Sequence, residues 1–194
     1  MKTERLTFIN ATGHQLAARL ERPDEGIPRA YALFAHCFTG TKSLRAVSNI
    51  AQSLTEQGIA VFRFDFTGLG ESEGDFSDTN FSSNVTDLVS AANFLEANYE
   101  APKILVGHSL GGAAVLQAAH SIPSAIAVAT IAAPYEPSHV LHLISDRQDE
   151  IENTGEALVK IGGRSFKIKK QFLDDLEDAT MEETVSKLKR ALII

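Results

Sequence analysis

The feature that most constrains the fold is an alternation of short apolar runs with segments of helical period. Three apolar runs, at residues 31–35, 59–64 and 103–107, have the length of buried strands. The segments between them place apolar residues every three or four positions, as on one face of a helix. Strands alternating with helices predict a mostly parallel sheet with helices on both faces. The chain is therefore expected to be an α/β protein.

The first twenty residues predict a different local structure. Residues 6–9 and 15–20 flank the turn-forming sequence Asn10-Ala11-Thr12-Gly13. Two extended runs joined by such a turn predict an antiparallel hairpin. A hairpin in this place could protect one edge of the sheet.

Residues 134–180 interrupt the alternation after a fourth apolar run at 125–131. A helix-like stretch, a hairpin turning at Gly162-Gly163 and a charged helix at 170–177 are expected there. We interpret this segment as a small cap insertion in a single domain of residues 1–194. A further helix follows, with Met181, Val185 and Leu188 expected on its buried face, and residues 191–194 begin another strand.

Length, composition and charge exclude several classes of protein. The chain has 194 residues, of which 44% are hydrophobic and 22% charged, as in an ordinary one-domain globular protein. A net charge of −7 argues against a nucleic-acid partner. Cys37 is the single cysteine, which excludes an intrachain disulfide and fits a reducing compartment. No apolar run has the length of a signal peptide or a membrane span, so we expect a cytoplasmic protein.

The most specific motif is Gly107-His108-Ser109-Leu110-Gly111, which fits G-x-S-x-G between an expected strand and an expected helix. A tight turn in this context holds the serine at positive φ and lifts its Oγ clear of the sheet. Glycines on both sides of the serine avoid Cβ clashes where strand and helix approach. The pattern predicts a nucleophile elbow with Ser109 as the catalytic residue, supported by Gly107, His108 and Gly111.

A second motif follows the neighbouring strand. His36-Cys37-Phe38-Thr39-Gly40 comes directly after the run at 31–35, and a loop there can aim the Phe38 N–H at an oxyanion. The Leu110 N–H, at the start of the helix after Ser109, is the second expected donor. His36 is expected to support this loop.

These motifs together resemble those of the α/β-hydrolase superfamily. His36–Gly40 stands in the place of the family's oxyanion loop, and Asp65–Ser72 is similar to its glycine loop. More closely, the chain resembles the hydrolase half of bacterial proteins that fuse an α/β-hydrolase to an OsmC-like redox domain. The resemblance implies Ser-His-Asp esterase, peptidase or related acyl-transfer chemistry, and it names no substrate. Cys37 departs from the family's usual glycine, which would tighten the approach of a substrate carbonyl.

A dinucleotide site is the main competing interpretation of the glycine loop. Gly68-Leu69-Gly70 lacks the third glycine, because Glu73 stands at that position. Glu71, Glu73 and Asp75 would also repel a pyrophosphate. We therefore expect no cofactor.

Other reactive side chains have simpler interpretations. Cys37 is either a reactive thiol or, as we favour, a small buried hydrophobe. His108 is expected to be structural, and His139 and His142 lack the further ligands of a metal site. The acidic residues of the charged helix fit a solvated face. The apolar residues of the cap pack it against the sheet or form an acyl pocket, and they are Phe166, Phe172, Leu173 and Leu176.

A serine nucleophile needs a histidine base and an orienting carboxylate. In the α/β-hydrolase order both follow the serine, the acid after a later strand. Residues 191–194 begin such a strand, and no residue of the chain matches either partner. We expect the chain to be the N-terminal piece of a longer hydrolase, truncated at its own C-terminus, with weak or no ester turnover by itself. Its exposed strand edge would favour homo-oligomers.

Two functions remain open. The first is a serine hydrolase acting on the ester, thioester or amide bond of a small-molecule acyl substrate. The second is a non-catalytic α/β-hydrolase-like module for binding or scaffolding, linked to an OsmC-like redox domain in the parent polypeptide.

Overall fold

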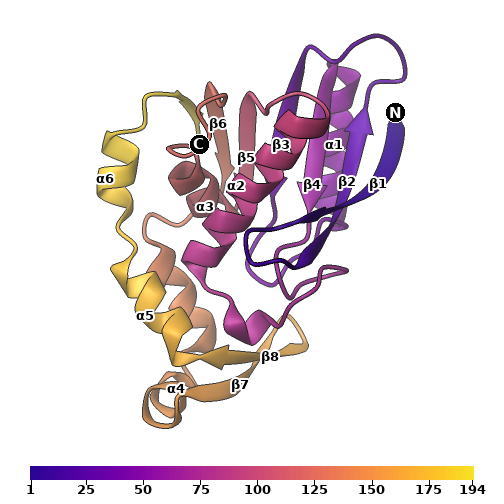
Figure 1. The fold of residues 1–194 in the computed structure, drawn as a ribbon. Helices are drawn as coiled ribbons and strands as arrows, with labels where there is room; N and C mark the ends of the chain where they lie inside the picture. Colours follow the sequence, from indigo (N-terminus) through magenta and orange to yellow (C-terminus); the bar gives the residue numbers. More distant parts are fainter.

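The computed structural model describes all residues, 1–194, and is built around one seven-stranded sheet (Figure 1). The strand order is β1-β2-β4-β3-β5-β6-β9, and β7 and β8 form a separate two-stranded sheet. The strands are β1 Lys2–Ile9, β2 Gln15–Arg22, β3 Ala30–Ala35, β4 Ile59–Phe64, β5 Ile104–His108, β6 Ala127–Ile131, β7 Glu156–Ile161, β8 Arg164–Lys169 and β9 Ala191–Ile193. The helices are α1 Arg45–Glu56, α2 Phe81–Asn98, α3 Leu110–Ala118, α4 Gln148–Thr154, α5 Lys170–Asp178 and α6 Met181–Ser186, with 3₁₀ segments η1 Phe76–Asp78 and η2 Pro137–Ile144.

Strand direction confirms the predicted α/β organisation. β4, β3, β5, β6 and β9 are parallel, whereas β1 and β2 form the expected antiparallel hairpin and join the sheet beside β4. In the parallel part, Ala35 at the end of β3 lies opposite Gly107 of β5. The loops that leave β3 and β5 therefore start side by side at the same edge of the sheet.

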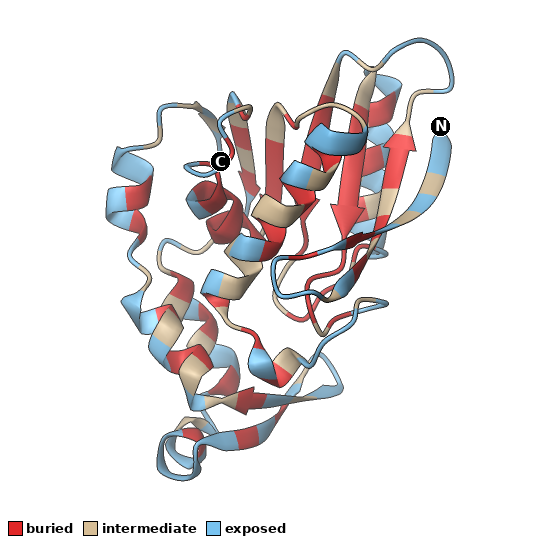
Figure 2. Ribbon diagram, in the orientation of Figure 1, coloured by how far each residue is buried: buried red, intermediate tan, exposed pale blue.

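Helices cover the sheet on both faces. Val47 and Ala51 of α1 pack on one face against a small cluster that includes Phe34. On the other face α2 and α3 pack against the large core cluster, which includes Leu33 and Leu105. Leu33 and Phe34 point to opposite faces because side chains alternate along a strand. Figure 2 shows this burial as red strands flanked by helices that are red on their inner sides.

Residues 134–180 form η2, α4, the β7–β8 hairpin and α5, and they add no strand to the main sheet. The predicted hairpin turn is confirmed, because Gly162 and Gly163 both have positive φ, of 57° and 80°. The apolar residues expected to pack this segment do so: Phe172, Leu173 and Leu176 are buried in the large cluster, and Phe166 packs against it partly buried.

The predicted buried face of the helix after residue 180 is wrong in part. α6 buries Met181 and Thr184, whereas Val185 is 41% exposed. Leu188 lies beyond the helix but packs against the core, partly buried. Thr184 Oγ1 donates to Gln117 Oε1 at 2.6 Å, which holds this side of α6 against α3. A polar anchor therefore sets the rotation of α6, and apolar spacing alone could not reveal it.

The outer side of β9 exposes apolar residues. β9 pairs only with β6, and Ile193 is 70% exposed. None of the helices combines the length and the apolar character needed to cross a bilayer.

Phe8 provides a test of how the opening hairpin is held. Its ring lies 5.5 Å from that of Phe64 and 5.6 Å from that of Phe94, with 4% of the residue exposed. We expect Phe8→Ala to lower the free energy of unfolding by roughly 3–5 kcal/mol, because it leaves a cavity between hairpin and core. Ile9→Ala, on the opposite, 60% exposed side of β1, should change it by less than about 0.5 kcal/mol. Urea denaturation measures both, and equal losses would contradict this account.

Candidate active site

Ser109 occupies a strained turn between β5 and α3. Its backbone has φ 55° and ψ −127°, which confirms the positive φ predicted for an elbow serine. Such a conformation costs a non-glycine residue about 1–3 kcal/mol and persists only where the surroundings enforce it. The Ser109 N–H donates to Ile131 O of the neighbouring strand at 2.9 Å, which fixes the turn against β6.

The glycines of the motif are required by close backbone approach. A Cβ on Gly107 would lie 2.3 Å from Gly111 O, and one on Gly111 would lie 2.3 Å from His36 O. Both separations are far below van der Waals contact, so a side chain would push α3 away from β5 or from the loop after β3. The predicted reason for these glycines is therefore confirmed. The short distance from Gly111 to His36 O also shows that the start of α3 packs directly on the loop after β3.

Two backbone N–H groups near this turn lack a partner within the protein. Leu110 is the first residue of α3, where an N–H has no intrahelical acceptor, and the turn closes through Gly112 N–H to Ser109 O at 2.7 Å. The Phe38 N–H, in the loop after β3, donates to neither a backbone nor a side-chain acceptor. Unpaired donors at the rim of a sheet suit an incoming anionic oxygen. Their role as an oxyanion hole remains a prediction.

The direction of the Phe38 N–H is set by the carbonyl of the same peptide unit. Cys37 O accepts from the Gly40 N–H at 2.8 Å and lies 2.9 Å from His36 Nδ1. Because a trans peptide is planar, fixing this C=O also fixes the N–H on its opposite side. Thr39, two residues after Cys37, has φ 58°, so the turn is held in a left-handed geometry that a β-branched residue seldom adopts.

His36 supports this loop from below and is fully buried. Its Nδ1 donates to Cys37 O, and its Nε2 accepts from the Phe66 N–H at 3.4 Å, an assignment that requires the neutral ring. Burial lowers the pKa of His36 to about 4, consistent with neutrality at physiological pH. The Phe66 ring meets His36 edge-on at 4.8 Å.

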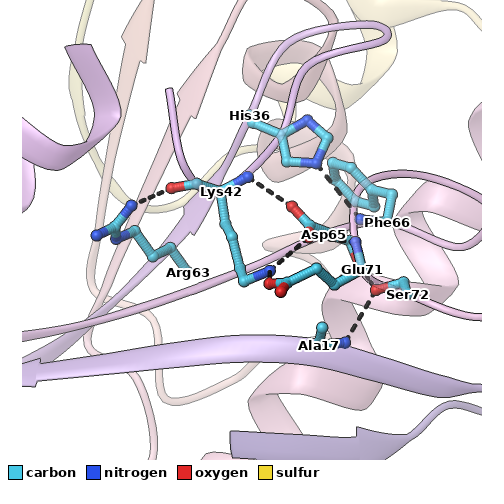
Figure 3. A network of polar contacts seen from close by, with 8 residues as sticks. All are labelled: Ala17, His36, Lys42, Arg63, Asp65, Phe66, Glu71 and Ser72. Carbon is cyan, nitrogen blue, oxygen red and sulfur yellow. Dashed lines mark hydrogen bonds and ion pairs between the residues drawn. The ribbon is translucent and has the colours of Figure 1, made fainter. Parts of the chain in front are cut away.

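A buried ion pair ties the loop after β3 to the loop after β4 (Figure 3). The Asp65 carboxylate accepts from the Lys42 N–H at 2.6 Å, from Lys42 Nζ at 2.5 Å and from the Glu71 N–H at 2.9 Å. The side chains of Lys42 and Asp65 are only 2% and 1% exposed. Lys42 Nζ also donates to Glu71 at 2.6 Å, and this hydrogen bond lowers the Glu71 pKa. A Cβ on Gly70 would lie 2.1 Å from the Asp65 carboxylate, so the glycine loop is shaped around this charge.

A second buried pair lies behind the first. Arg63 Nε donates to Glu21 at 2.9 Å, and a second guanidinium nitrogen of Arg63 donates to the Lys42 carbonyl (Figure 3). Arg63 belongs to β4 and Glu21 to β2. The loop after β3 is thus held through both its amide and its carbonyl at Lys42.

The space beside the loop is narrow and apolar. A crevice of about 10 Å³ lies between the loop after β3, the loop after β4 and the start of α3, and its lining includes Phe38, Leu69, Phe76 and Leu110. A space of this size holds about one water molecule. An acyl group could enter only if these side chains move.

The other predicted residues are placed as follows. Cys37 is half-buried and burial raises the pKa of its thiol, which favours the interpretation as a small hydrophobe over a reactive thiol. His108 is half-buried at the end of β5. The rings of His139 and His142 lie 4.8 Å apart, and no set of three or more His, Cys, Asp or Glu side chains is arranged to hold a metal ion. No histidine or carboxylate makes a hydrogen bond with the Ser109 hydroxyl.

Sequence reasoning missed two contributors to this site. The sequence pattern marks Asp65 only as the start of a glycine loop, although an acidic residue at the end of a buried strand, followed by tight turns, is a detectable signal. Arg164 gives no signal, because it lies 125 residues from the Thr39 carbonyl to which it donates.

Comparisons with known proteins show the family and the fold of the chain. Residues 26–180 match the family described as serine aminopeptidase, S33. The esterase domain of a Rhodothermus marinus protein is 50% identical, with a TM-score of 0.75 over 99% of this chain and 75% of that one. Est1E from Butyrivibrio proteoclasticus, 19% identical with a TM-score of 0.76 over 97% of this chain and 75% of that one, shares the fold.

Two curated relatives match shorter regions. Monoglyceride lipase of Rattus norvegicus is 33% identical over 119 residues, which are 60% of this chain and 38% of that protein. Mitochondrial palmitoyl-protein thioesterase ABHD10 of Homo sapiens is 38% identical over 87 residues, 45% of this chain and 26% of that protein. The chain thus spans less than half the length of these curated relatives.

The strain at Ser109 can be measured directly. We expect Ser109→Gly to raise the free energy of unfolding by about 1 kcal/mol relative to Ser109→Ala, because only glycine adopts this φ and ψ without steric cost. Urea denaturation of the two variants is the measurement. If Ser109→Ala were as stable as Ser109→Gly, the turn would not be strained.

His36 should make stability depend on pH. Its pKa is about 4 in the folded protein and near 6.5 in the unfolded chain, so between these values the unfolded chain binds one more proton. The free energy of unfolding should therefore fall as the pH is lowered from 6.5 to 4, with His36 contributing about 3 kcal/mol of that loss. Denaturation at several pH values should show a shallower dependence for His36→Asn. Equal slopes for the two proteins would contradict a buried neutral histidine.

Proposed function

Because the chain belongs to the serine aminopeptidase S33 family and has the α/β-hydrolase fold, we propose that it carries the nucleophile and oxyanion hole of an esterase-type acyl hydrolase. The observation that carries this proposal is the strained backbone of Ser109 beside two unpaired N–H groups. Strain of this kind persists at functional sites, where it presents a side chain in a fixed direction. A turn that only joined β5 to α3 would be better served by glycine.

In the proposed reaction, Ser109 Oγ attacks the carbonyl carbon of an acyl substrate and its proton passes to a histidine base. The Phe38 and Leu110 N–H groups receive the negative charge that develops on the carbonyl oxygen. Collapse of this intermediate returns the proton to the leaving group and leaves an acyl group on Ser109. Water then attacks the carbonyl carbon of the acyl group and gives a proton to the histidine. Collapse of this second intermediate breaks the bond to Ser109 Oγ, returns the proton to that oxygen and releases the acid. Four residues only support the loop after β3 and the turn after β5, and they touch no reacting atom: His36, Gly107, His108 and Gly111.

The base and its orienting acid are proposed to come from residues outside these 194. No histidine within the chain bonds to the Ser109 hydroxyl, and the similar esterase domain is longer, since this chain aligns with 75% of it. In this proposal the 194 residues by themselves show weak turnover or none. In this proposal residues 1–194 form a single domain, in which residues 134–180 are a cap beside the site.

The proposed substrate is a small molecule with an ester, thioester or amide bond to an acyl group. Two relatives, a monoglyceride lipase and a palmitoyl-protein thioesterase, are named for fatty-acyl esters and thioesters. The apolar lining of the crevice at Phe38, Leu69, Phe76 and Leu110 supports an apolar acyl group.

The wider context of the protein stays a prediction. A cytoplasmic location, a linked OsmC-like domain and homo-oligomers through the exposed β9 edge are proposals from the sequence. One relative is mitochondrial by name. A role in binding or scaffolding without turnover is the alternative that the test below distinguishes.

The test is covalent labelling of Ser109 by a fluorophosphonate, read by peptide mass, together with hydrolysis of p-nitrophenyl butyrate. We expect slow labelling at Ser109, because no histidine of the chain assists its hydroxyl, with loss of that adduct in Ser109→Ala and no change in Ser121→Ala, an exposed serine after α3. Ester turnover of the 194-residue chain should be weak, because an unassisted hydroxyl is a poor nucleophile.

Two outcomes would overturn parts of this proposal. If a longer polypeptide with the same site bound acyl ligands but neither labelled at Ser109 nor turned over ester, the binding-module function would be correct. If the 194-residue chain turned over ester rapidly and Ser109→Ala abolished it, the base would lie within the chain or in a second copy of it.

A further inference from the structure

The β7–β8 hairpin reaches the oxyanion loop, residues 36–42, through one side chain. Arg164 is the first residue of β8, directly after the Gly162–Gly163 turn, and its guanidinium donates to Thr39 O. This is the only hydrogen bond that the Thr39 carbonyl receives. Thr39 is the residue at positive φ, so the guanidinium contacts the oxyanion loop at its most strained point.

The guanidinium is itself held by aromatic contacts. It lies over the ring of Phe166, two residues along β8, at 5.1 Å from the centroid. Phe166 packs on Phe76 at 5.1 Å, and Phe76 packs on Phe38 at 5.8 Å. Phe172 of α5 also stacks on Phe38, with the two rings 5.2 Å apart and only 20° from parallel. The segment from β8 to α5 therefore contacts two neighbouring residues of the oxyanion loop: Phe172 packs on Phe38, and Arg164 donates to Thr39 O.

Arg164 is not what holds the hairpin and α5 to the rest of the protein. Gln171 Nε2 donates to Thr79 O at 2.9 Å, and Asn80 Nδ2 donates to Gln171 Oε1 at 2.8 Å. Asp175 accepts from the Ser82 N–H at 2.9 Å, and Phe172 is buried in the core. With these anchors in place, loss of an exposed guanidinium should change global stability little. Its effect should be confined to the oxyanion loop.

We propose that Arg164 is a positioning residue, which holds the Thr39 carbonyl and so keeps the Phe38 N–H unpaired and directed for an oxyanion. This inference rests on the proposed function, because it assigns the oxyanion hole to Phe38. Without the guanidinium, the Cys37–Gly40 turn is free to relax toward a geometry with negative φ at Thr39. The peptide units on both sides of Thr39 would then rotate, and the donor would lose its fixed direction.

Two variants on the same hairpin make the comparison. Arg164→Met removes the donor and keeps most of the side-chain length. Lys160→Met, the matched control, removes an exposed cation from β7 that takes part in no ion pair. The first measurement is hydrogen exchange of the Gly40 amide, whose bond to Cys37 O closes the turn. We expect Arg164→Met to accelerate this exchange about tenfold, as for loss of one charge-assisted hydrogen bond, and Lys160→Met to leave it unchanged.

The second measurement is the saturable rate of fluorophosphonate labelling at Ser109 in the same 194-residue chain. Arg164→Met should lower the maximal rate about tenfold, with an unchanged half-saturating concentration and an unchanged melting temperature. A role limited to packing the hairpin would instead lower the melting temperature and leave the labelling rate of the folded protein intact. That result, or unchanged Gly40 exchange in Arg164→Met, would overturn the inference. If the wild-type chain failed to label at all, the proposed function would be in question, and Gly40 exchange would still decide whether Arg164 positions the loop.

Discussion

The buried Asp65 carboxylate is the interaction on which the arrangement of the candidate site depends. It receives the amide and the ammonium group of Lys42 from one loop and the Glu71 amide from another. Removing the Lys42 ammonium would leave the buried Asp65 carboxylate without its counter-charge, which is far costlier than losing a surface contact. The positions of the loop after β3 and the loop after β4 therefore depend on each other through Asp65. Ser72 extends the network, because its hydroxyl donates to Asp65 O and accepts from the Ala17 N–H of β2. The opening hairpin thus does more than protect a sheet edge: it anchors the glycine loop.

Backbone strain is concentrated at the same edge of the sheet. The three non-glycine residues with positive φ are Thr39, Ser109 and Ala132, and they follow β3, β5 and β6, which are adjacent parallel strands. The Ser109 N–H donates to Ile131 O, directly before Ala132, so the two strained turns lie next to each other. The central residues of β3 and β5 are buried, and this packed sheet supplies the rigidity that keeps these conformations populated. Strained turns on a rigid sheet are what a site needs when it must hold donors in place before a substrate arrives.

Local patterns in the sequence predicted the strands, the helices, the opening hairpin and the elbow, because each depends on residues close together in the chain. The glycines around Ser109 were informative since they report a backbone distance that no other residue allows. The pairing of Lys42 with Asp65 and of Arg164 with Thr39 could not be predicted, because it depends on how distant loops meet after the sheet has formed. The prediction of the buried face of α6 was wrong in part for a related reason. A hydrogen bond from Thr184 to Gln117, not apolar spacing, determines the rotation of this helix.

The proposed chemistry divides into two parts with different structural requirements. The nucleophile and the oxyanion donors are positioned by β3, β4, β5 and the loops that follow them, all of which pair and pack within the 194 residues. A histidine base needs only to reach Ser109 Oγ from one side, so it can be supplied by a separate segment without altering this core. Electrostatic stabilisation by fixed backbone donors persists even when triad residues are removed, as serine proteases show. On this reasoning, the geometry at Ser109 and Phe38 is a property of the sheet and its loops, and completing the triad adds proton transfer to a site that is already organised.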